Sequence, residues 1–120
     1  MYKLKKLNEF KKLENCDWEF IKMYFDEETV KDFILFAESP GNDPLCINIK
    51  YGEIYLFSHD PVKSAKVFNT FNDFLLNEII GLQELMGDMK FDNEKEKSKA
   101  LKALLPGNDI DYDFRFMKLG

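Results

Sequence analysis

The sequence has few of the residues from which metal sites and nucleophilic sites are usually built. In 120 residues it contains one histidine, His59, and two cysteines, Cys16 and Cys46. The two cysteines form only one pair and fit no metal-ligand spacing, and Cys46 lies within a run typical of a buried strand. We therefore expect no metal ion and no other cofactor, and two free thiols in a reducing cytoplasm.

Long apolar runs are also missing. No run approaches the roughly 18 apolar residues that a membrane-spanning helix needs. The basic start, MYKLKKLNEFKK, is interrupted by a charge every two or three residues, which does not fit a secretory signal peptide. The length suits one compact domain, and no segment resembles a linker, so we expect a single domain over residues 1–120 that is cytoplasmic and does not contact a membrane.

Positive charge is in deficit. The chain has 22 acidic and 17 basic residues, a net charge of −5. Binding to a phosphate backbone needs clustered Lys and Arg, so this balance disfavours nucleic acid as a partner. It suits a basic protein partner, because opposite potentials speed encounter, although acidity also serves solubility alone.

Aromatic residues are abundant, with twelve Phe, and hydrophobic periodicity divides the chain into helices and strands. Leucines and a phenylalanine recur every three residues near the start, an aromatic β-prone run follows, and turn formers separate the later apolar runs. The expected elements are an amphipathic helix in 3–14, a strand in 18–25, a helical turn in 26–32, strands in 32–38, 45–50 and 53–58, a long helix in 70–87, a short helix in 100–105 and a strand in 109–116.

A hairpin is expected where two β-prone runs meet at Tyr-Gly, residues 51–52, because glycine accepts the positive φ that a two-residue loop requires. With that loop, Ile49 lies opposite Ile54 and Ile47 opposite Leu56 on the core face.

The adjacent His59 and Asp60 suggest a catalytic dyad at first sight. Neighbours on a strand point to opposite faces, so His59 shares its face with Tyr55 and Phe57 while Asp60 begins a turn before Pro61. We therefore interpret the pair as the end of a strand, and no nucleophile, carboxylate pair or phosphate-binding loop suggests catalysis.

Three aspartates in the tail, Asp109, Asp111 and Asp113, have the spacing of a calcium loop. The remaining positions do not fit, because Phe114 replaces the required glycine and Gly120 the bidentate glutamate. The stripe fits either an acidic strand edge that resists unwanted pairing or a docking face for a cationic protein.

Several of these segments, in this order, resemble the SUKH superfamily of Smi/Knr proteins. The resemblance covers about residues 33–80, and the first 32 residues lack the L-P-x-x-[YF] motif that members usually carry. The residues that carry it are Gly41 to Asp43, the G-x-[IV]-[YF] strand at 52–55, His59-Asp60 and the F-x-x-F-L helix start at 71–75.

The resemblance implies an α+β fold, a mostly antiparallel sheet of about four to six strands with helices packed against it, and no catalysis. It also implies an immunity protein that binds and neutralises a cognate toxin, often a nuclease. The alternative is a regulatory or scaffold module. The partner surface we predict is an acidic patch drawn from Asp43, Asp60, Asp109, Asp111 and Asp113, facing a basic toxin domain.

Overall fold

The computed structural model describes residues 2–104, and the predicted strand at 109–116 with its three aspartates lies outside them. Twelve short elements follow one another in this part of the chain. In order they are β1 (Lys3–Leu4), η1 (Leu7–Glu9), β2 (Lys11–Lys12), η2 (Leu13–Asn15), α1 (Glu19–Tyr24), α2 (Glu27–Val30), β3 (Phe33–Glu38), β4 (Pro44–Asn48), β5 (Ile54–His59), β6 (Val62–Phe68), α3 (Phe71–Leu85) and α4 (Glu94–Leu104).

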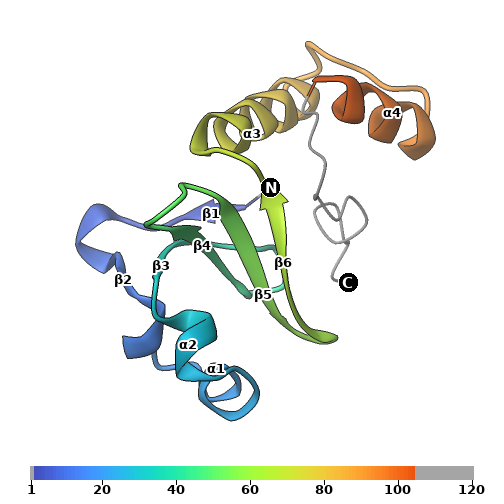
Figure 1. Ribbon diagram of the computed structural model, residues 1–120. Coiled ribbons are helices and arrows are strands. Elements are labelled where there is room, and N and C mark those ends of the chain that lie inside the picture. Colours follow the sequence, from blue (N-terminus) through green and yellow to red (C-terminus); the bar gives the residue numbers. More distant parts are fainter. Residues whose placement is uncertain (1, 105–120) are drawn as a thin grey trace.

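Within residues 2–104, six strands form one antiparallel sheet. Its order is β1-β3-β4-β5-β6, and β2 pairs with the same edge of β3 as β1 does. Helices α3 and α4 lie on one side of the sheet and α1 and α2 on the other (Figure 1). The predicted α+β class is thus confirmed, with strands joined mostly by short turns.

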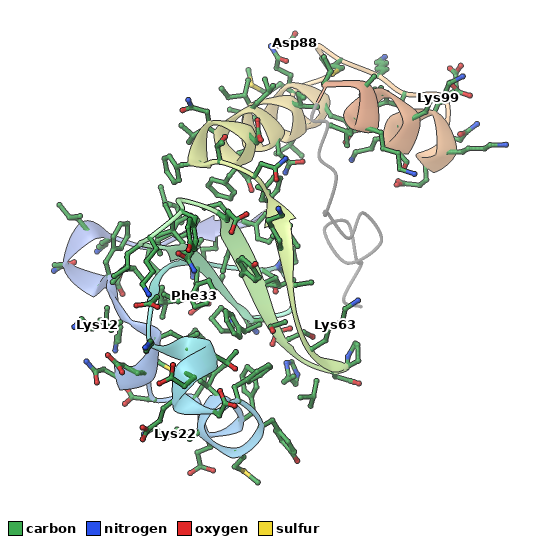
Figure 2. The ribbon with its side chains drawn as sticks, in the orientation of Figure 1. Lys12, Lys22, Phe33, Lys63, Asp88 and Lys99 are labelled. Atoms are coloured by element: carbon green, nitrogen blue, oxygen red, sulfur yellow. The ribbon has the colours of Figure 1, made fainter. Side chains whose placement is uncertain are left out.

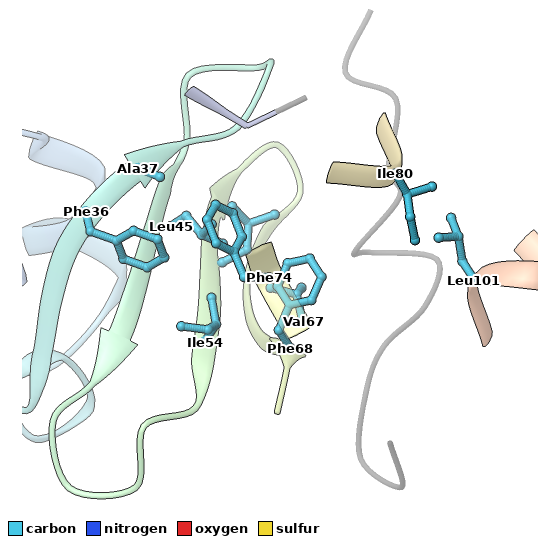
Figure 3. Close-up of a cluster of buried hydrophobic side chains, with 10 residues drawn as sticks. Phe36, Ala37, Leu45, Ile54, Val67, Phe68, Phe74, Ile80 and Leu101 are labelled. Carbon is cyan, nitrogen blue, oxygen red and sulfur yellow. The ribbon is translucent and has the colours of Figure 1, made fainter. Parts of the chain in front are cut away.

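Both faces of the sheet are buried, which explains why β3 to β5 show little polar alternation. The cluster beneath α3 is built on even-numbered β5 residues such as Ile54 and Leu56, and Phe74 enters it from the helix (Figure 3). Its rings meet edge to face, with Phe74 at 5.2 Å from Phe36 and 5.7 Å from Phe68 between centroids. The opposite cluster takes Phe57 from the same strand and joins it to α1 and α2.

The hairpin between β4 and β5 forms, but with a longer loop than predicted. Ile47 lies opposite Ile54 and Leu45 opposite Leu56, a shift of two residues from the predicted register. The cause is local, because the Asn48 side chain accepts hydrogen bonds from the N–H groups of Lys50 and Tyr51 and closes a loop over 49–52. A shift of two leaves every side chain on its predicted face.

The long helix occurs as predicted, as α3. The side chain of Thr70 accepts a hydrogen bond from the N–H of Asp73 at 3.1 Å, which caps the first turn. Gly87 follows the end of the helix with φ +82°, the left-handed conformation that glycine adopts readily. The next helix, α4, starts six residues before the predicted one, so the charged residues of 94–99 are also helical.

The prediction of a strand in 18–25 is wrong, since residues 19–24 form helix α1. Trp18, Ile21 and Phe25 are spaced three and four residues apart, so a helix places all three against the sheet while Glu19 and Lys22 stay outside. Packing against the sheet therefore overrides the β propensity of the aromatic residues.

The predicted amphipathic helix in 3–14 is also wrong. Two 3₁₀ turns, η1 and η2, alternate with the short strands β1 and β2. A repeat of three matches the 3₁₀ helix rather than the α-helix, and only Leu13 of the repeating residues is buried there. The segment pairs instead with the edge of β3, which supplies backbone hydrogen-bond partners for β1 and β2.

Strand β6 was not predicted. It pairs with β5 along six residue pairs, from Ile54 opposite Phe68 to His59 opposite Val62. Its sequence, VKSAKVF, is only partly alternating and carries two lysines, so the pattern that marks a strand is weak. The turn that joins it to β5 consists of Asp60 and Pro61, joined by a cis peptide bond.

Candidate functional site

The loop between β3 and β4 brings an aspartate into the interior. Ser39 and Asp43 close this loop with two hydrogen bonds, from the Ser39 N–H to the Asp43 carbonyl at 2.8 Å and from the Asp43 N–H to the Ser39 hydroxyl at 3.1 Å. Asn42 takes φ +66°, which bends the chain inside the loop. Asp43 is fully buried as a result.

The end of β5 lies next to this loop, because β4 begins where its antiparallel partner β5 ends. His59, the last residue of β5, donates its backbone N–H to Oδ1 of Asp43 at 3.3 Å. Its ring atom Nδ1 also contacts Oδ1 in a short, direct hydrogen bond. The histidine thus pairs with an aspartate sixteen residues away, and its sequence neighbour Asp60 turns outward.

The pair is asymmetric in burial. The side chain of His59 keeps 51% of its surface exposed, whereas that of Asp43 has none. Oδ2 of Asp43 is buried and accepts no hydrogen bond from the residues that the structure describes. Burying a carboxylate costs free energy of desolvation unless hydrogen bonds or an opposite charge offset it. The imidazole and the backbone N–H of His59 supply most of that offset for Asp43.

This contact changes the acid–base behaviour of the histidine. The hydrogen bond and the negative charge of Asp43 raise the pKa of His59 above its ordinary value of about 6.5, and the charge of Asp60 adds to the effect. Burial works in the opposite direction but is outweighed. The imidazole therefore carries its positive charge to a higher pH than a free histidine does.

Helix α1 completes the surroundings of the histidine. The ring of Phe20 lies 5.7 Å from the imidazole, between centroids, with the planes tilted by 52°. The half-exposed imidazole thus contacts both a buried carboxylate and an aromatic ring. Within residues 2–104, no three His, Cys, Asp or Glu side chains lie close enough together to hold a metal ion.

The acidic residues of the predicted partner surface are placed differently from one another. Asp60 is exposed on the β5–β6 turn, where a partner can reach it. Asp43 is inside and reaches the surface only through His59, which does not fit a direct role in an exposed acidic patch. Asp109, Asp111 and Asp113 lie outside the described residues.

The contact between Asp43 and His59 was missed at the level of sequence. A signal was present, because a hairpin with its loop near residue 52 brings the residue before β4 close to the end of β5. Only the burial of Asp43 could not be read from the pattern, since Asp is rarely buried and stood among turn formers.

Comparison with known proteins identifies a family. No curated protein and no solved structure matches the chain. The model of the SMI1 / KNR4 family (SUKH-1) matches residues 1–77, which extend from β1 through the first half of α3 and include the loop of Asp43 and the end of β5. The match also covers the first 32 residues, in which the resemblance seen in the sequence was missing. The chain belongs to the SMI1 / KNR4 family (SUKH-1).

Proposed function

We propose that this protein is an immunity protein that binds a basic toxin domain in the cytoplasm and blocks it without catalysing a reaction. The family match over residues 1–77 carries this proposal, because domains of this family generally act by binding a partner protein. The net charge of −5 supports a basic partner. None of the helices in residues 2–104 is long and apolar enough to cross a membrane.

The contact face that we propose is centred on the β5–β6 turn. Asp60 is exposed there, and the contact of His59 with buried Asp43 fixes the end of β5 that carries this turn. A turn held in place in this way loses little conformational entropy when it binds. Asp109, Asp111 and Asp113 remain part of the proposed contact surface on the basis of the sequence alone.

Co-expression with the polypeptide encoded directly upstream tests the function. An immunity protein is expected to co-purify with that polypeptide as one tight stoichiometric complex and to remove its toxicity. Several weak partners recovered from a lysate, with no protection against that polypeptide, would favour the regulatory or scaffold module.

Charge reversal tests the face. Exposed charges mainly set the association rate, so Asp60→Lys should slow association by about tenfold at low salt and by less at high salt. The matched control is Asp92→Lys, since Asp92 is also exposed but lies between α3 and α4. Equal effects of the two variants on the association rate in surface plasmon resonance would show that Asp60 does not lie in the interface. That result would not contradict the proposed function.

A further inference from the structure

Helix α3 presents an apolar surface to solvent as well as to the core. Phe74 and Ile80 are buried, but several large apolar side chains on the helix remain 38–77% exposed. Figure 2 shows side chains of this helix projecting away from the sheet. Five of them, hereafter the apolar stripe, are Phe71, Leu75, Ile79, Leu82 and Met86.

The members of the apolar stripe lie on one narrow arc of the helix. Their spacings of four, four, three and four residues keep them within about 80° at 100° per residue. Ile80, about 100° from the edge of this arc, packs instead on Leu101 of α4 (Figure 3). Phe71, at one end of the stripe, contacts Phe36 of β3 with 5.6 Å between ring centroids, whereas the other four side chains remain 39–66% exposed.

The arc carries no charge. Helix α3 has three charged side chains, and each is directed elsewhere. Glu84 pairs with Lys97 of α4 at 2.6 Å, Glu78 accepts the N–H of Tyr2 at 3.1 Å, and Asp73 lies on the opposite side of the helix. Beside one edge of the stripe the polar residues Asn72 and Gln83 are neutral, and beside the other edge lies Glu78, whose carboxylate is engaged by Tyr2. A charged partner would find only Glu78 at the edge to pair with, whereas a second apolar surface would match the uncharged arc itself.

The stripe is close to self-complementary about its centre. In an antiparallel pair of α3 helices, Ile79 meets Ile79 of the other copy, Leu75 meets Leu82, and Phe71 meets Met86. A two-fold interface requires this relation, in which each residue meets its counterpart in both directions. At the exposures given above, the stripe with its neighbours Leu76 and Leu85 offers on the order of 500 Å² per copy, so that two copies bury about 1,000 Å², the minimum for a stable interface.

We propose that the apolar stripe of α3 is a homodimer interface in which the α3 helices of two copies pack antiparallel around Ile79. This surface is separate from the β5–β6 turn proposed for the toxin. Each protomer of the dimer therefore keeps its Asp60 turn available to a partner.

The oligomeric state in solution is the first test. Analytical ultracentrifugation over a hundredfold concentration range should show a species of twice 14.2 kDa that gives way to the monomer on dilution. Ile79→Glu should remove the dimer while leaving the circular dichroism spectrum unchanged, because Ile79 is 52% exposed in the monomer. The control Leu7→Glu, at an 81% exposed leucine outside the stripe, should leave the dimer intact. A wild-type monomer at every concentration would overturn the proposal.

Cross-linking tests the orientation and does not depend on a destabilising variant. Both native cysteines are buried, so one introduced thiol on α3 is the accessible one. Ile79→Cys should give a disulfide-linked dimer on mild oxidation, since the two positions meet at the axis. Met86→Cys should not, because the same residues lie about 20 Å apart along antiparallel helices at 1.5 Å per residue. Equal cross-linking of both variants would contradict the antiparallel arrangement.

Discussion

Replacing Asp43 by asparagine isolates the interaction that fixes the end of β5. Asn keeps the shape and the acceptor Oδ1 but removes the charge, so the hydrogen bond from the His59 N–H at 3.3 Å persists while the charge-assisted bond to the imidazole weakens. A hydrogen bond to a charged group contributes about 1.5–3 kcal/mol, and the half-exposed imidazole reduces this through solvent screening. We expect Asp43→Asn to cost about 1–2 kcal/mol of unfolding free energy at acidic pH.

The pH dependence follows from the raised pKa of His59. A group whose pKa is higher in the folded than in the unfolded state stabilises the fold fully below its unfolded pKa. That contribution is lost as the pH rises through the folded pKa. The cost of Asp43→Asn, measured by urea unfolding, should therefore be larger near pH 6 than near pH 8.5.

A direct assay exists because His59 is the only histidine. Its imidazole resonances in a proton NMR titration report a single site without assignment. The midpoint should lie above the ordinary value of about 6.5 in the wild type, fall clearly in Asp43→Asn, and fall only slightly in Asp60→Asn, because Asp60 is the smallest of the contributions that raise this pKa. An unchanged midpoint in Asp43→Asn would refute the pairing of His59 with Asp43. A larger fall in Asp60→Asn than in Asp43→Asn would show that His59 pairs with its neighbour Asp60.

Three further predictions concern the framework around the site. Phe74→Ala removes a ring that is 2% exposed and should cost about 3–5 kcal/mol in urea unfolding, whereas a cost below about 1 kcal/mol would show that α3 does not pack on the sheet as described. Gly52→Ala should cost about 1 kcal/mol from its φ of +74° alone, because an added Cβ meets no atom within 4 Å, and a neutral effect would mean that the loop changes conformation. Burial raises the pKa of the Cys46 thiol, and Cys16 is also buried, so a thiol reagent should label neither in the native protein at neutral pH and both in urea; rapid native labelling would show that the sheet opens.

Local patterns predicted the elements that have strong and unambiguous periodicity. The run from Phe71 to Leu85 has a helical apolar face, an N-cap threonine and a following glycine, and all three signals agree. The runs that became β3, β4 and β5 are apolar, β-prone and separated by turn formers. These elements depend little on what packs against them.

Elements with a weak or mixed pattern were settled by their neighbours. The aromatic segment 18–25 is compatible with a strand or a helix. It forms a helix because three apolar side chains of the segment, Trp18, Ile21 and Phe25, then contact the sheet. Strand β6 has little alternation of its own and exists because the Asp60-Pro61 turn returns the chain along β5.

The sequence by itself determined the family pattern, the faces of the central hairpin and the position of His59 at the end of a strand. Those features follow from side-chain periodicity and turn chemistry within short segments. Only the tertiary structure decided that His59 pairs with Asp43 rather than Asp60. Burial depends on how loops from distant segments close over one another, and an aspartate among turn formers carries no local mark of the interior.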